Sequence, residues 1–237
     1  MPSEPLILST PTSGTSGETD VVLVVVGDGR EEYLAEAIAS VRSELQGDIV
    51  KKAIIDDSGD REYGHHLVQR YPDFDVISHG QRMGMAMAIR SAWAYALTSG
   101  APFVFHLEED FVFNRTIRLE ALINILNDHP QLSQIVLQRQ PWSSEEQGVG
   151  NVIAYAAPDA QRHDTRGFRW CEHDSIFSVN PTLIPRRVVE MGWPTDNEAG
   201  MTEALRAAGM TMGWLGDVGD PPAVTHIGHR RGEGWKL

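Results

Sequence analysis

The chain has 237 residues, of which 41% are hydrophobic, and a formal net charge of -13 at pH 7. This length allows one large domain or two small ones, and the composition is sufficient for a sizeable core. The negative charge argues against a general nucleic-acid surface, which would bind phosphate through clustered Lys and Arg. The longest aliphatic run, Val21 to Val26, is too short for a membrane span. Cys171 is the only cysteine, so no intramolecular disulfide can form and a reducing, cytoplasmic location is expected.

The first 19 residues are rich in Ser, Thr, Pro and Gly, a composition that buries little apolar surface. We predict a disordered tail for residues 1–19 and a single folded domain for residues 20–237. From Asp20 onward, predicted strands and helices alternate. The strands are Val21–Val26, Val50–Ile55, Asp75–Ser78 and Phe103–Leu107, and the helices run from about Leu34 to Leu45, up to Tyr71, and from Met83 to Leu97. This order predicts an α/β fold with a mostly parallel central sheet and helices on both faces.

The second half of the chain is less regular. A helix over Leu119–Leu126 and a strand over Gln134–Leu137 continue the pattern, which then fades over residues 140–170. That length is typical of a functional loop or lid, and an irregular surface excursion with small strands of its own fits equally well. Order returns with a strand region at 175–184, helices near 186–191 and 197–208, and a strand at 212–215.

Three consecutive carboxylates, Glu108, Glu109 and Asp110, follow the predicted strand Phe103–Leu107. They lie at the carboxyl end of that strand, where open α/β sheets bind their ligands. Partly buried carboxylates repel one another and need a cation. Oxygen ligands suit Mg²⁺ or Mn²⁺, which proteins hold with one or two carboxylates plus substrate phosphates. The sequence therefore predicts a divalent metal site here, and the alternative is a solvated acidic turn.

The order of motifs in the first half resembles a known family. It begins with a strand and a helix, continues with a second strand that ends in Asp56-Asp57-Ser58-Gly59 and a glycine-containing helix start at Gln81–Arg90, and reaches a fourth strand that ends in acids. This order is similar to the nucleotide-sugar half of GT-A glycosyltransferases, especially family 2. The resemblance implies a GT-A fold with a nucleotide-sugar half at 20–114, an acceptor half at 115–218, and a tail at 219–237 that closes over the site. It implies a metal-dependent enzyme that moves a sugar from a nucleoside diphosphate sugar to a hydroxyl acceptor.

The resemblance also implies roles at the donor site. Asp57 would accept a hydrogen bond from the nucleotide base and Asp56 would support its turn, although turn chemistry alone also explains this sequence. Gly84 would let the backbone approach the nucleotide, and Arg82 or Arg90 would meet the ribose or diphosphate, unless both are only solvated helix charges. The other nucleotide-sugar contacts are assigned to Gly27 and Glu109.

The acidic motif of the family is Asp-X-Asp, whereas this chain has Glu108-Glu109-Asp110. The resemblance favours Asp110 as a ligand and leaves its partner open, and we assign the Mn²⁺ or Mg²⁺ site to Glu108, Asp110 and His226. His226 is similar to the histidine near the C-terminus that is the third ligand in many GT-A enzymes, and His229 competes with it. The ion would act as a Lewis acid on the departing diphosphate.

An inverting transferase also needs a base that takes the proton of the acceptor hydroxyl. Glu198 is the candidate, because it shares the inward stripe of the predicted helix with Met201 and Leu205. Two alternatives stand beside it. Thr195-Asp196-Asn197-Glu198 matches a capping box, in which Glu198 would satisfy only a backbone N–H, and a retaining enzyme would require no such base.

The acceptor is not specified by the sequence, and a glycan, a protein hydroxyl or a modified nucleobase all fit. Two other classes of function compete with a glycosyltransferase. A nucleotidyltransferase uses a related sheet, but the loop Gly27-Asp28-Gly29-Arg30 is short and acidic for that class. A non-catalytic nucleotide-binding or glycan-binding module is the third hypothesis, and the acids together with a terminal histidine argue against it.

Overall fold

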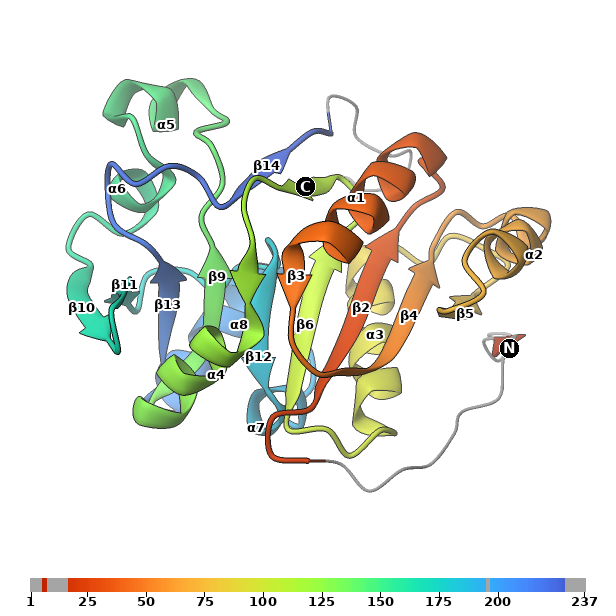
Figure 1. Cartoon of the computed structure of the whole chain (residues 1–237), viewed down its shortest axis with the longest axis horizontal. Helices are drawn as coiled ribbons and strands as arrows, with labels where there is room; N and C mark the ends of the chain where they lie inside the picture. The colour runs from red at the N-terminus through yellow and green to blue at the C-terminus, as the bar shows by residue number, and fades with distance from the viewer. Residues whose placement is uncertain (1–5, 8–16, 195–196, 229–237) are drawn as a thin grey trace.

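A ten-stranded sheet forms the centre of the protein. The structure, a computed structural model, describes residues 6–7, 17–194 and 197–228 (Figure 1). The strands of the sheet are ordered β1-β5-β4-β2-β6-β12-β9-β13-β11-β10. Four neighbouring strands form a parallel unit: β5 (Asp75–Ser78), β4 (Ile49–Asp56), β2 (Val21–Gly27) and β6 (Phe103–Glu108).

The other half of the sheet is mixed. β9 (Leu132–Leu137) and β13 (Thr211–Leu215) are parallel to each other, and β12 (Thr182–Pro185) lies antiparallel between β6 and β9. The hairpin of β10 (Gln161–Thr165) and β11 (Phe168–His173) closes one edge, while β1 (Leu6–Ile7) pairs antiparallel with β5 at the other. Because β12 is antiparallel to both neighbours, β6 and β9 point the same way and their carboxyl ends share one edge of the sheet.

Helices cover both faces of the sheet, as the alternating pattern predicted. One face carries α1 (Glu31–Glu44), α2 (Arg61–Arg70) and α4 (Leu119–Asp128), and the other carries α3 (Met85–Leu97), α7 (Arg186–Val189) and α8 (Glu198–Ala207). Every residue of β2 is buried, and its side chains alternate between the two apolar clusters. The expected α/β fold is confirmed.

Two short ribbons stand outside the main sheet. β7 (Phe111–Phe113) pairs antiparallel with β14 (Val224–His226), and β3 (Leu45–Gln46) pairs with β8 (Ile117–Arg118). The first ribbon matters for function, because it brings the C-terminal part of the chain beside the residues that follow the acids. Among the described residues, no helix combines the length and the apolarity needed to cross a membrane.

The region expected to be a loop or lid is partly ordered. Residues 140–170 contain α5 (Ser144–Val149), α6 (Val152–Ala156) and strand β10. The strand expected over 175–184 is much shorter, since only its end forms β12. Side chains bind the backbone there instead: Thr202 Oγ1 accepts from the N–H of Phe177, and Glu198 accepts from the N–H of Val179.

Candidate active site

The three acids occupy the carboxyl end of β6, as predicted, and the structure surrounds them with partners. Glu108 is the last residue of β6, and Glu109 and Asp110 are buried in the turn before β7. The site is built from four places in the chain. These are the β6–β7 turn, the turn after β2, the start of α8, and the β14 segment.

Arg30 is the cation at the centre of the acid cluster. Its Nε lies 2.8 Å from Asp28 Oδ1 and 2.7 Å from Glu109 Oε1, and its Nη1 lies 2.9 Å from Asp110 Oδ2. Burial alone would lower the pKa of Arg30, but the surrounding carboxylates raise it, so the side chain stays charged. Sequence reasoning missed this role. The available signal was a basic residue in the turn after the first strand, Gly27-Asp28-Gly29-Arg30.

Glu109 is the most enclosed of the three acids. The N–H of Asp28 donates to its Oε1 at 3.1 Å, while Oε2 is buried without a hydrogen-bond partner in the described structure. Burial, followed by the proximity of Asp28, raises the pKa of Glu109. A Cβ on Gly27 would collide with Glu109 Oε2. The structure therefore places the sequence-predicted residue Gly27 against Glu109, where only glycine leaves space for the carboxylate.

Asp110 and His226 lie side by side. His226 Nε2 is 3.2 Å from Asp110 Oδ2, and the register of the β7–β14 ribbon pairs His226 with Phe111. Burial acts to raise the pKa of Asp110, but His226 and Arg30 outweigh it and the pKa is lowered. The carboxylate is therefore ionised at neutral pH. His229, the competing ligand in the sequence, lies outside the described residues.

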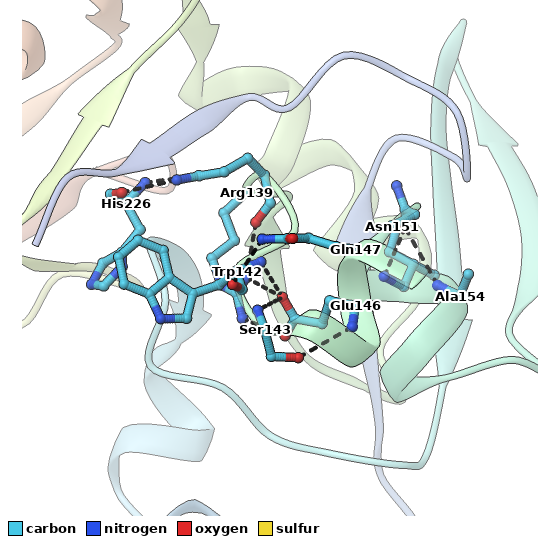
Figure 2. A network of polar contacts seen from close by, with 10 residues as sticks. Arg139, Trp142, Ser143, Glu146, Gln147, Asn151, Ala154 and His226 are labelled. Atoms are coloured by element: carbon cyan, nitrogen blue, oxygen red, sulfur yellow. Dashed lines mark hydrogen bonds and ion pairs between the residues drawn. The ribbon is translucent and has the colours of Figure 1, made fainter. Parts of the chain in front are cut away.

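The ring and backbone of His226 are both held in place. The ring is 4.8 Å from the Phe111 ring and 4.4 Å from the Trp142 ring. The Gln140 side chain donates to the His226 carbonyl at 2.8 Å and accepts from the His226 N–H at 2.9 Å. Figure 2 shows the Trp142 ring beside His226. Gln140 was not among the predicted site residues, and sequence spacing offered no sign of it.

The segment that carries Trp142 is fastened by one buried ion pair. Nη1 and Nη2 of Arg139 donate to Glu146, at 2.7 and 2.8 Å, and the N–H of Trp142 donates to the same carboxylate at 2.6 Å (Figure 2). Glu146 also completes a capping box with Ser143 at the start of α5. This part of the region, for which either a functional loop or lid or a surface excursion was expected, is thus a structured element that holds the Trp142 ring against His226.

Glu198, the proposed base, lies at the start of α8. It is the first residue of α8, its Oε1 accepts from the N–H of Val179 at 2.7 Å, and burial raises its pKa. Asn197 is the residue that caps the helix, through a bond from the N–H of Gly200. The capping box expected from Thr195 to Glu198 cannot be compared in full, because Thr195 and Asp196 lie outside the described residues, but the helix begins at Glu198 with Asn197 as its N-cap. Burial raises the pKa of Glu108, and the charges of Asp110 and Glu198 raise it further.

The two acids after β4 have different partners. Asp56 is buried and accepts from the Ser58 N–H at 2.9 Å and from the Ser78 hydroxyl at 2.8 Å, so it stabilises the turn. Asp57 accepts from the N–H of Met83 at 2.6 Å and from the N–H of Gly84 at 2.8 Å. It therefore joins this turn to the start of α3. Each carboxylate oxygen has a second acceptor position, so base recognition by Asp57 stays a prediction.

The two candidate arginines belong to different surroundings. Arg82 donates to the carbonyls of Ser58 and Asp28, at 2.9 and 3.3 Å, and so lies beside the turns that lead to Asp57 and Arg30. Arg90 donates to the carbonyl of Trp193 at 3.3 Å and is directed toward the segment before α8. Gly84 has φ 82°, a left-handed conformation that favours glycine at the start of α3.

The donor chemistry of this site fits a divalent cation. Asp110 and His226 supply an ionised oxygen and an imidazole nitrogen side by side, and Mn²⁺ accepts both kinds of ligand. Among the described residues, no three His, Cys, Asp or Glu side chains are already gathered around a metal position. Arg30 instead supplies the positive charge that the acids require. A metal ion that binds here would therefore have to share the carboxylates with Arg30 or replace Arg30 at them.

Comparison with known proteins agrees with this geometry. The model of glycosyl transferase family 2 matches residues 20–189. Among solved structures, the chain is similar to the mannosyltransferase PcManGT from Pyrobaculum calidifontis in complex with GDP-Man and Mn²⁺, with 13% identity, a TM-score of 0.57, and coverage of 97% of this chain and 62% of that chain. It is also similar to GalNAc-T7 with UDP, GalNAc and Mn²⁺, with 12% identity, a TM-score of 0.60, and coverage of 92% and 44%. No curated protein matches the chain.

The fold is that of the GT-A class of glycosyltransferases. The chain belongs to glycosyl transferase family 2. It spans 62% and 44% of the two solved proteins, which at these identities share its fold. The family match favours the transferase over the nucleotidyltransferase and the non-catalytic module that the sequence also allowed.

Proposed function

We propose that the protein transfers a sugar from a nucleoside diphosphate sugar to a hydroxyl acceptor, with a divalent cation at Asp110 and His226. The observation that carries this proposal is the pair itself. A ribbon between distant segments places an ionised carboxylate 3.2 Å from an imidazole, beside the end of β6. Both solved neighbours were determined with Mn²⁺ and with a nucleotide or nucleotide sugar, which supports the same chemistry here.

The donor is assigned to the region between the turn after β2 and the start of α3. Asp57 and Gly84 would meet the nucleotide, and Arg82, which already reaches the turn after β2, is better placed for the diphosphate than Arg90. The bound ion would supply Lewis-acid stabilisation of the leaving diphosphate. Arg30 would add a fixed positive charge at the same place. Glu108 is assigned as the further ligand, and Glu109 to the sugar side.

Glu198 is the proposed base of an inverting transfer. In that step the acceptor oxygen forms a bond to the anomeric carbon, the bond to the diphosphate breaks, and the hydroxyl proton passes to the Glu198 carboxylate. Burial raises the pKa of Glu198, which strengthens it as a proton acceptor. The N–H of Val179 orients its other oxygen. A retaining transfer would leave Glu198 without this role.

The proposal is tested by incubating the protein with Mn²⁺ and a panel of nucleotide sugars and measuring released nucleoside diphosphate. Asp110→Ala should abolish turnover and the metal-dependent part of nucleotide binding. Glu203→Ala, an exposed acid on α8, is the matched control and should keep both. Full activity of the wild type in excess chelator would refute the metal requirement, and release by Asp110→Ala at the wild-type rate would refute the site.

A further inference from the structure

A cavity lies away from the acid cluster, on the face of the sheet that carries α1 and α4. Its volume is about 580 Å³, within the range of small-molecule and saccharide sites. It is bounded by β8, the start of α4, the tip of the β10–β11 hairpin, and the end of β13. None of the residues assigned to the donor, the metal or the base lines it. We call it the arginine pocket, after Arg115, Arg118 and Arg169 in its wall.

The charge of this pocket is opposite to that of the whole protein. The chain carries 33 acidic residues against 20 basic ones, yet three arginines and one acid, Asp220, line this cavity. Asp220 is already used, because its Oδ1 lies 2.6 Å from Arg169 Nη2. Within the part of the chain that the structure describes, Arg115 and Arg118 have no acidic partner. Two guanidinium groups are thus available to an anion, and their planar forks match carboxylate, sulfate or phosphate.

The rest of the wall is suited to a ring. Phe168, at the tip of the β10–β11 hairpin, is 38% exposed although it is a large apolar side chain. The floor is apolar and is formed by buried side chains that include Leu122 and Leu215. Aromatic faces pack against the apolar faces of sugar rings, and nearby arginines bind the acidic groups that such rings carry. Inorganic phosphate would use the arginines but not Phe168.

We infer that the arginine pocket binds an acidic saccharide, at a site separate from the transfer centre. The choice of a saccharide rests on the proposed function, whereas the requirement for negative charge rests on the lining alone. The pocket and the active site are linked through the chain, because the segment that contains Asp220 leads directly into β14 and His226. A bound acidic chain would therefore lie beside a segment that positions the candidate metal ligand.

The test measures binding directly, so that it does not depend on catalysis. Calorimetric titration compares trigalacturonate, maltotriose and inorganic phosphate as the carboxylated, neutral and free-anion probes. Wild type should bind trigalacturonate with one site and in a salt-dependent manner, and should not bind maltotriose measurably. Arg115→Ala/Arg118→Ala should weaken that binding about 10- to 100-fold, as expected from the loss of charge-assisted hydrogen bonds. Phe168→Ala should weaken trigalacturonate binding and leave any phosphate binding unchanged.

Two controls separate this site from others. Arg42→Ala/Arg70→Ala removes the same charge from exposed positions on α1 and α2 and should bind trigalacturonate like wild type. Asp110→Ala should also bind it normally while losing turnover, so failure of the proposed function and failure of this inference give different results. Equal affinity of wild type and the Arg115/Arg118 double variant would overturn the inference. So would binding of phosphate without trigalacturonate, or no trigalacturonate binding at millimolar concentration.

Discussion

Nε of Arg30 lies 2.7 Å from Oε1 of Glu109, and the two side chains are 17% and 1% exposed. The residues are 79 positions apart in the chain, so this ion pair joins the turn after β2 to the end of β6. Because Arg30 also contacts Asp28 and Asp110, one guanidinium is shared by three carboxylates at the site. The cluster therefore depends on Arg30 when no other cation is bound.

Arg30→Gln should destabilise the protein strongly. Removing one partner of a buried ion pair costs roughly 3–5 kcal/mol, because the remaining charges stay buried and uncompensated. Urea unfolding would measure the loss, and added Mn²⁺ should raise the melting temperature of the variant more than that of wild type. Arg42→Gln breaks the exposed contact with Asp73 and should cost less than about 1 kcal/mol. Equal stability of Arg30→Gln and wild type would contradict the assignment.

Gly228→Ala should displace Asp110, the proposed metal ligand, without changing its chemistry. A Cβ at residue 228 would collide with Oδ2 of Asp110, the atom that faces His226. We expect the substitution to displace the carboxylate and weaken Mn²⁺-dependent nucleotide binding at least tenfold, or about 1.4 kcal/mol. Calorimetry with nucleoside diphosphate would measure it. Gly148→Ala is the control, since a Cβ there meets nothing within 4 Å, and similar binding by both variants would disprove the clash.

Glu198→Gln should separate chemistry from folding. A glutamine keeps the size of the side chain and an oxygen that can accept from Val179, so the variant should fold and bind the donor. The loss of a positioned base should lower kcat by roughly 10²- to 10⁴-fold. Steady-state kinetics and the product anomer would be determined together. Near-normal turnover, or retention of configuration, would remove Glu198 from the mechanism.

The difference in stability between Glu198→Gln and wild type should depend on pH. Burial raises the pKa of folded Glu198 above its ordinary value of 4.5. The contribution of Glu198 to the free energy of unfolding is fully present below pH 4.5, where the carboxyl is protonated, and is lost as pH rises through the pKa of the folded state. Glutamine stays neutral, so the stability of Glu198→Gln relative to wild type should increase as pH rises above 4.5. Unfolding free energies at pH 4.5 to 8 would show it, and parallel curves would rule it out.

Asp57→Ala distinguishes base recognition from turn support. Loss of a buried hydrogen-bond partner of the nucleotide should weaken nucleoside diphosphate binding by roughly 1–3 kcal/mol. The bonds to Met83 and Gly84 are lost as well, so stability should also fall, by about 0.5–2 kcal/mol if they act as a cap does. Asp56→Ala removes only turn contacts and serves as the comparison. Reduced stability with unchanged affinity would assign Asp57 to the turn alone.

The parallel half of the fold was predictable from local pattern. Continuous buried runs such as Val21–Val26 identify central strands, and the acids after Phe103–Leu107 follow from their position at a strand end. These patterns lie in neighbouring residues. Burial of their apolar side chains favours the strand independently of more distant parts of the chain. The helix that Glu198 begins was predictable for the same reason.

Tertiary structure alone decided which distant residues complete the site. Arg30 reaches the acids because β2 and β6 are neighbours in the sheet, and His226 reaches Asp110 because β14 pairs with β7. Gln140 holds His226 across 86 positions of sequence. The strand around 175–184 shortened because side chains of α8 satisfy its backbone N–H groups. Local sequence carries no record of these contacts, since their free energy arises only when separate elements pack and bury charges together.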